Sequence, residues 1–192
     1  MNGNIESLYR RIKELEEELE VELARAAEAL EFHFERGRVR FNRQVALAHR
    51  RMRQSLYRYL RGARLLNILT APVILALIVP LAALDLCVTV YQFICFPVYG
   101  IRKVPRSDFI TLDRHHLEYL NAAEKFNCVY CGYANGLFAW LREVGARTEE
   151  YWCPIKHARR IRNPHSRYAN FVAYGDAAGY RGKLDAWYKK NK

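Results

Sequence analysis

The sequence lacks the short motifs that carry the commonest enzyme chemistries. It contains no glycine-rich phosphate-binding loop, no nucleophile elbow and no H-E-x-x-H pair. These absences give no support to a nucleotide-binding enzyme, a serine hydrolase or a zinc protease. Whether the chain is an enzyme is left open by the sequence, and a non-enzymatic role is favoured.

Charge of one sign is missing from long parts of the chain. Residues 36–64 carry ten arginines and no acidic residue, whereas residues 1–35 carry ten acidic and four basic side chains. Residues 65–101 contain a single charged residue, Asp85. The net charge of +11 therefore flanks an apolar segment. This pattern favours a membrane as the partner over nucleic acid.

The apolar segment, residues 65–101, is too long and too apolar for an ordinary core helix. It begins at Leu65, behind a charged region, so it does not have the position of a cleaved signal peptide. We interpret it as membrane-embedded. A helix that crosses a bilayer needs about 20 residues, and this segment is nearly twice as long.

Two arrangements of this segment are open. Pro80 and Asp85 interrupt it near the middle, which favours a transmembrane hairpin with Asp85 near its turn. Arginines and lysines follow the segment as well as precede it, and positive flanks mark the cytoplasmic side. We therefore predict an integral membrane protein with both the N-terminal and C-terminal regions in the cytoplasm. A single long or kinked span is the alternative.

The N-terminal region, residues 1–36, is predicted to be an acidic helical arm. Its apolar residues recur every three or four positions, which indicates a narrow helical stripe of the coiled-coil kind. Such a stripe needs a partner, so we predict a homo-oligomer through residues 8–34. The stripe consists of Leu8, Ile12, Leu15, Leu19, Leu23, Ala26, Leu30 and Phe34.

Residues 37–64 are predicted to form a second helix, basic and amphipathic, after a break at Gly37. Apolar residues alternate there with arginines at helical spacing, a composition typical of helices that lie on anionic lipid headgroups. Pairing with the acidic arm is compatible with this interpretation. Nucleic acid is the less favoured partner, since the neighbouring apolar segment already accounts for the charge.

Cysteines in the C-terminal region, residues 107–192, suggest a metal site. Cys128, Cys131, Cys153 and His157 form a C-x2-C-x21-C-x3-H pattern. Three thiolates and one imidazole make a closed tetrahedral zinc set. The spacing predicts that Gly132 completes a tight turn after the second ligand, and that Pro154 begins a helix with Cys153 at its cap. Clustered cysteines in a cytoplasmic module more often bind metal than form disulfides.

Other interpretations of these cysteines remain open. Cys128 and Cys131 could act as a redox dithiol at a helix N-terminus, although the βαβ pattern of thioredoxin-like proteins is missing. The same four residues could hold iron or an iron–sulfur cluster, or no metal at all. Gly132 stands where a c-type haem site requires histidine.

Three further features have ordinary structural interpretations. His116 falls on the apolar face of a helix expected from Leu112 to Phe126, and Cys87 and Cys95 fall in the apolar segment. All three are expected to be packing residues. In the tail, Tyr168, Phe171 and Tyr174 recur every three residues and are expected to pack against the metal-bearing helices.

Together these features predict an all-α membrane protein. Its parts are a coiled-coil-like arm, a basic amphipathic helix, a hydrophobic hairpin and a small helical module clamped by zinc. The function predicted is that of an interaction or scaffold protein at the cytoplasmic membrane face. The alternative is a membrane-bound thiol-redox or iron protein that uses Cys128, Cys131 and Cys153.

Overall fold

A computed structural model describes residues 3–29, 32–35 and 38–190 of the chain. The described residues are mostly helical, and they fall into two compact units. One unit comprises residues 1–62 and 113–126, and the other comprises residues 63–112 and 127–192.

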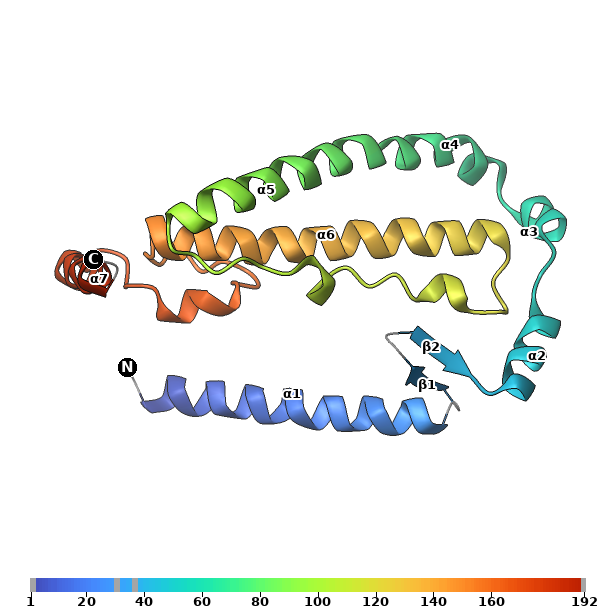
Figure 1. Cartoon of the computed structure of the whole chain (residues 1–192), viewed down its shortest axis with the longest axis horizontal. Coiled ribbons are helices and arrows are strands. Elements are labelled where there is room, and N and C mark those ends of the chain that lie inside the picture. Colours follow the sequence, from blue (N-terminus) through green and yellow to red (C-terminus); the bar gives the residue numbers. More distant parts are fainter. Residues whose placement is uncertain (1–2, 30–31, 36–37, 191–192) are drawn as a thin grey trace. The chain divides into compact units, whose positions relative to one another are not determined.

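The first unit begins with the long helix α1 (Gly3–Ala29), which confirms a helical N-terminal arm (Figure 1). A hairpin of two antiparallel strands follows, β1 (Phe32–Glu35) and β2 (Arg38–Phe41), with Phe32 opposite Phe41. Aromatic and β-branched residues favour strands, and the prediction that the helical arm reaches Phe34 is wrong. Leu30 and Gly37 lie outside the described residues.

Two short helices replace the single basic helix predicted over residues 37–64. They are α2 (Arg43–Met52) and α3 (Leu56–Gly62). The side chain of Asn42 accepts a hydrogen bond from the backbone N–H of Gln44 and caps the start of α2. Arg53 leaves helical geometry and pairs instead with Glu118 (2.8 Å), which explains the interruption.

The second unit contains the apolar segment, which forms α4 (Leu65–Ala76) and α5 (Ile78–Val98). The two helices continue one another with a kink at Leu77 and no reverse turn, as the ribbon shows (Figure 1). The hairpin prediction is therefore wrong, and the single-helix alternative agrees with the structure. Pro80 cannot donate a hydrogen bond to the carbonyl of residue 76, so it kinks the helix and does not reverse it.

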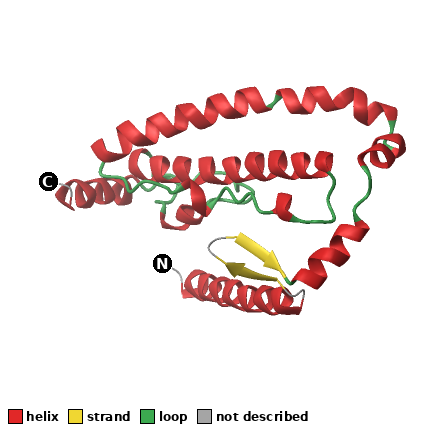
Figure 2. Ribbon diagram, turned by 45° about the vertical axis from the view of Figure 1, so that its right-hand side comes forward, coloured by secondary structure: helices red, strands yellow, loops and turns green. Residues whose placement is uncertain are grey.

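After α5 the chain runs back along the helix as an irregular return segment, residues 99–112. It contains one short 3₁₀ turn, η1 (Arg106–Asp108). Both ribbon views show α6 (Ala122–Trp152) lying alongside α5 (Figures 1 and 2). The core of the unit lies between these three elements and consists of Phe96, Val104, Leu137, Trp140 and Val144.

Helix α6 is one unbroken helix of 31 residues, which differs from the prediction. The expected helix from Leu112 to Phe126 is replaced by a 3₁₀ turn, η2 (Arg114–His116), and the start of α6. Asn121 and Glu124 cap that start reciprocally, each side chain accepting the other's backbone N–H (3.1 and 2.8 Å). The helix ends at Trp152, two residues before Pro154, because the residue that precedes a proline disfavours helical geometry.

The C-terminal region is partly irregular. An isolated parallel bridge pairs Ile155 with Val172, and the chain then forms η3 (Ser166–Asn170) and α7 (Ala177–Lys190). The helix predicted to begin at Pro154 does not form. Phe171 is buried, as its periodic spacing predicted, whereas Tyr174 is exposed.

Candidate functional site

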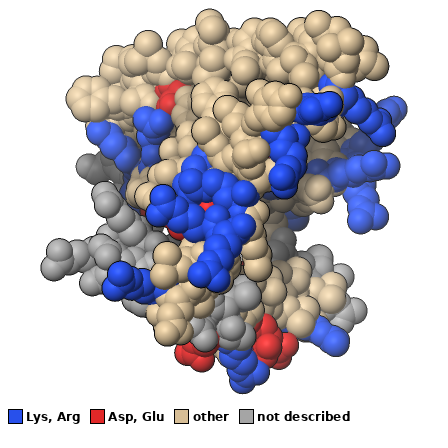
Figure 3. All heavy atoms as spheres, turned by 90° about the vertical axis from the view of Figure 1, so that its right-hand side faces the viewer, with Lys and Arg blue, Asp and Glu red and all other residues tan. Residues whose placement is uncertain are grey.

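The outer face of α4 and α5 is a continuous exposed apolar surface. The helical segment Leu65–Val98 is long and apolar enough to cross a membrane. Only 6% of its most apolar stretch is buried within the protein. In the space-filling view the ridge that these helices form carries no basic residue (Figure 3). Its most exposed members, which we call the outer face, are Leu65, Leu66, Leu69, Val73, Val79, Leu86, Phe93 and Val98.

The inner face of α5 is polar and paired. Asp85 is only 8% exposed, and its carboxylate accepts hydrogen bonds from Tyr133 of α6 (2.8 Å) and Arg106 of the return segment (2.5 Å). Thr89 adds a longer contact of 3.4 Å. Burial raises the pKa of Tyr133, and its hydrogen bond to Asp85 raises that pKa further. The prediction that Asp85 lies near a hairpin turn is therefore wrong, since it lies within α5.

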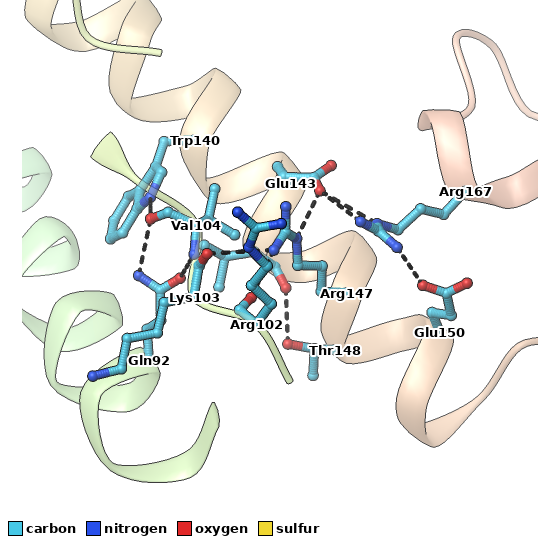
Figure 4. A network of polar contacts seen from close by, with 11 residues as sticks. Gln92, Arg102, Lys103, Val104, Trp140, Glu143, Arg147, Thr148, Glu150 and Arg167 are labelled. Carbon is cyan, nitrogen blue, oxygen red and sulfur yellow. Dashed lines mark hydrogen bonds and ion pairs between the residues drawn. The ribbon is translucent and has the colours of Figure 1, made fainter. Parts of the chain in front are cut away.

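A second set of hydrogen bonds attaches the return segment to both helices (Figure 4). The side chain of Gln92 accepts the backbone N–H of Val104 (2.5 Å) and donates to its carbonyl (3.3 Å). The indole N–H of Trp140 donates to the same carbonyl (3.0 Å). Gln92 and Trp140 thus satisfy both polar backbone groups of a buried residue, which would otherwise destabilise the fold by about 1–3 kcal/mol each.

Two glycines of α6 let the return segment approach closely. A Cβ at Gly136 would lie 2.7 Å from the carbonyl oxygen of Phe109 and 2.8 Å from the Cα of Ile110. A Cβ at Gly132 would lie 3.2 Å from the Leu112 side chain. The glycines are four residues apart and therefore share a helix face. Gly132 has this packing role, and not the turn that its position after Cys131 suggested.

Beyond the end of α5, arginines and glutamates form a compact network (Figure 4). Glu143 accepts hydrogen bonds from Arg147 (2.8 Å) and Arg167 (3.2 Å), and Arg167 also pairs with Glu150 (2.5 Å). Burial raises the pKa of Glu143, but the two arginines outweigh it and hold that pKa below its ordinary value. Burial lowers the pKa of Arg167, but Glu150 and Glu143 outweigh burial and raise that pKa above its ordinary value.

The structure does not bring the four predicted zinc ligands together. Cys128 and Cys131 lie one turn apart inside α6, while Cys153 follows the end of the same helix. At 1.5 Å per residue, Cys131 and Cys153 are separated by about 33 Å along the axis. Among the described residues, no group of three or more His, Cys, Asp or Glu side chains is placed to hold a metal ion. Zinc binding thus stays a prediction from spacing.

His157 and the cysteines have separate surroundings. The backbone N–H of His157 donates to the Tyr168 hydroxyl (2.7 Å), and the two rings are stacked. Cys128 is half-buried in the interior of α6, while Cys131 and Cys153 are exposed. Since Cys128 is seven residues into the helix, the dithiol does not occupy a helix N-terminus, and the redox alternative loses the feature that favoured it.

The other residues singled out from the sequence lie apart from one another. Cys87 is exposed on α5, Cys95 is half-buried, and His116 lies in η2 with its ring against that of His115 (3.9 Å between centroids).

Several residues of this site were missed at the sequence level. Arg106 and Tyr133 lie 21 and 48 residues from Asp85, too far apart for a local pattern to connect them. The Gly-x-x-x-Gly spacing of Gly132 and Gly136 was a usable signal for close packing, and Asn-x-x-Glu at residues 121–124 was a usable signal for a helix start.

Comparison with known proteins adds no relative. The chain matches no family model, no curated protein and no solved structure. Its function therefore has to be inferred from the surfaces and contacts described above.

Proposed function

We propose that this chain is a membrane-attached interaction protein whose helices α4 and α5 lie along one leaflet of a bilayer. The outer face supports this proposal. Soluble proteins seldom expose contiguous apolar patches beyond a few hundred Å², and here the apolar surface continues over 34 residues. Val98 is 77% exposed and Val73 is 71% exposed, so the surface extends along both helices.

The inner face favours a lying helix over one that crosses the bilayer. The return segment runs beside α5, and its Arg106 side chain remains 46% exposed while it pairs with Asp85. A crossing orientation would place this irregular backbone and its charges in the hydrocarbon layer. Lipid-exposed irregular backbone is not tolerated there, and a charge at the centre costs about 3 kcal/mol or more. The pairing of Asp85 with Arg106 is the observation that carries the proposal.

Length and flanking charge support the same orientation. A helix of 34 residues is about 51 Å long, whereas the hydrocarbon core is about 30 Å thick. Positive residues on both flanks call for both ends of the segment on one side of the membrane. A lying helix meets that requirement without the hairpin that the sequence suggested.

The test is thiol labelling of protein bound to the outside of sealed vesicles, with a membrane-impermeant maleimide. Cys87 and Cys153 are both exposed in the structure. We expect vesicles to protect Cys87 and leave Cys153 reactive, with equal labelling of both in denaturant as the control. Equal labelling of both cysteines on vesicles would show that α5 is not in the bilayer.

A second labelling site distinguishes lying from crossing. Arg61→Cys places a thiol before α4, and Cys153 lies after α5. A lying helix exposes both thiols to the external reagent. A crossing helix hides one of them until the vesicles are permeabilised, and that result would overturn the orientation while leaving membrane attachment intact.

The interaction role is assigned to α1. Its stripe residues Leu8, Ile12, Leu15, Leu19 and Leu23 are all more than half exposed, and their three- and four-residue spacing suits a helical partner. We propose a second copy of α1 as that partner, which would make the membrane-attached form a homo-oligomer.

A further inference from the structure

A cavity lies at the C-terminal end of α5. Its volume is about 290 Å³, and residues from four separate segments line it. Tyr99 is the residue that caps α5, Arg102 belongs to the return segment, Arg147 and Glu150 belong to α6, and the C-terminal region adds Arg167 and Lys183. We call these six residues the basic pocket.

Positive charge exceeds negative charge in the basic pocket. Four cationic side chains line it against one carboxylate, that of Glu150. Glu143 is the only further carboxylate that pairs with these arginines in the described part of the chain. Like charges that are brought together in a partly enclosed site repel one another, so the excess favours an anion between them.

The guanidinium of Arg147 is held in position but not fully used, whereas that of Arg102 is exposed at the same pocket. Glu143 fixes the Nε of Arg147 (2.8 Å), and the carbonyl of Arg102 fixes its Nη1 (2.6 Å). The Nη2 of Arg147 and the whole guanidinium of Arg102 donate no hydrogen bond to any described residue. Guanidinium donors that are positioned in advance suit the oxygens of a phosphate group.

The pocket lies at the end of the surface that we assign to lipid. An aromatic cluster borders it, in which the ring centroids lie 5.0–5.4 Å apart; its members are Tyr99, Tyr151 and Trp152. Tyrosine and tryptophan concentrate at the boundary between hydrocarbon and headgroups. This cluster therefore places the pocket at headgroup depth, provided that α5 lies in the bilayer as proposed.

We infer that the basic pocket binds the phosphate of an anionic phospholipid headgroup, with Arg102 and Arg147 as its donors. This inference rests on the proposed membrane attachment. It assigns a specific lipid contact to the C-terminal module, separate from the arginine-rich residues 36–64.

The experiment compares binding of the full chain to phosphatidylcholine vesicles with and without phosphatidylglycerol. Arg102→Gln removes a guanidinium that has no partner among the described residues. Arg160→Gln is the matched control, because it removes the same charge outside the pocket. We expect Arg102→Gln to reduce the preference for phosphatidylglycerol vesicles by about tenfold, the effect of one charge-assisted hydrogen bond, and Arg160→Gln to reduce it far less.

Equal losses in the two variants would show charge attraction without a site, and no loss in either would also overturn the inference. Competition by inorganic phosphate at constant ionic strength would assign the contact to the phosphate group itself. Loss in Arg102→Gln without such competition would assign it to the intact headgroup, and both results support the pocket.

If wild-type protein fails to bind phosphatidylcholine vesicles, the attachment proposal fails. Calorimetric binding of glycerol phosphate to the wild type, and its loss in Arg102→Gln, then tests the pocket alone.

Discussion

At the residue scale, the smallest side chains set how closely the return segment approaches α6. Gly136 lies where a Cβ would meet two backbone atoms of the return segment at less than 3 Å. Backbone cannot yield as a flexible side chain can, so this position tolerates no added carbon without movement. Gly145, in the same helix, has nothing within 4 Å of an added Cβ.

This contrast gives the first prediction. Gly136→Ala should lower the free energy of unfolding by about 1–3 kcal/mol, the usual cost of overpacking. Gly145→Ala should raise it by about 0.5–1 kcal/mol, because alanine loses less entropy in a helix than glycine does. Denaturant unfolding in detergent micelles measures both values. Equal effects of the two substitutions would contradict the close contact.

Glu143 gives a prediction about pH. Its pKa is held below the ordinary value by Arg147 and Arg167, so its contribution to stability is complete above the unfolded-state pKa, about 4.3. That contribution is lost as the pH falls through the lower, folded-state pKa. Glu143→Gln should therefore lower the free energy of unfolding by about 2 kcal/mol at pH 7.

The difference between wild type and Glu143→Gln should shrink below about pH 4, as measured by thermal unfolding over a pH series. Asp108→Asn is the control, because Asp108 is exposed and its carboxylate accepts a hydrogen bond from Ser107 but pairs with no cation among the described residues. A difference that stays constant down to pH 2 would show that Glu143 acts by packing and not by charge.

At the scale of elements, the continuity of α6 decides how its cysteines behave. A zinc knuckle needs a turn at residues 128–132, and the structure has a helix there that continues for another 20 residues to Trp152. If α6 is unbroken, Cys128 has no role in holding the C-terminal module together.

Cys128→Ser should therefore change the free energy of unfolding by no more than about 1 kcal/mol, the scale of a conservative change at a half-buried site. The protein purified without added metal should unfold in the same way before and after treatment with a chelator. If the free energy of unfolding fell by several kcal/mol in both experiments, the Cys3His zinc site would be supported. A second copy of the chain, or a different fold, would then be needed to bring its ligands together.

The elements also show which predictions the sequence could support. The helical arm and the long apolar segment are properties of local periodicity and composition, and both were predicted. The choice between a kinked helix and a hairpin in the apolar segment depends on how neighbouring groups pack, and the sequence favoured the wrong one. The strand pair of β1 and β2 was missed. Pro80 is the clearest case, because the same residue ends a helix in one context and only bends it in another.

At the scale of the whole molecule, the candidate site was harder to predict than the elements. The predicted zinc ligands are related only by their spacing in the sequence; they are Cys128, Cys131, Cys153 and His157. Spacing alone does not determine whether the chain between them turns. Asp85, Arg106 and Tyr133 show no spacing pattern, yet the structure joins them. Long-range pairs of this kind become visible only after the helices are placed.

Self-association is the prediction that concerns the whole molecule. Leu15→Glu with Leu19→Glu places charge in the exposed stripe of α1, and we expect it to convert an oligomer to a monomer. Val21→Glu is the matched control, because Val21 is also more than half exposed but lies off the stripe. Light scattering during size-exclusion chromatography measures the mass. A monomeric wild type, or equal effects of both variants, would contradict an oligomer through α1.

The pairing of Asp85 also constrains the order of events during synthesis. The carboxylate is made 21 residues before Arg106 and 48 residues before Tyr133. While the chain grows, α5 therefore carries an unpaired charge on one face and an apolar surface on the other. Such a helix can rest on a membrane but is penalised for entering it fully. On the proposed membrane attachment, the growing chain would be kept on the side where it emerged until the return segment closes over the carboxylate.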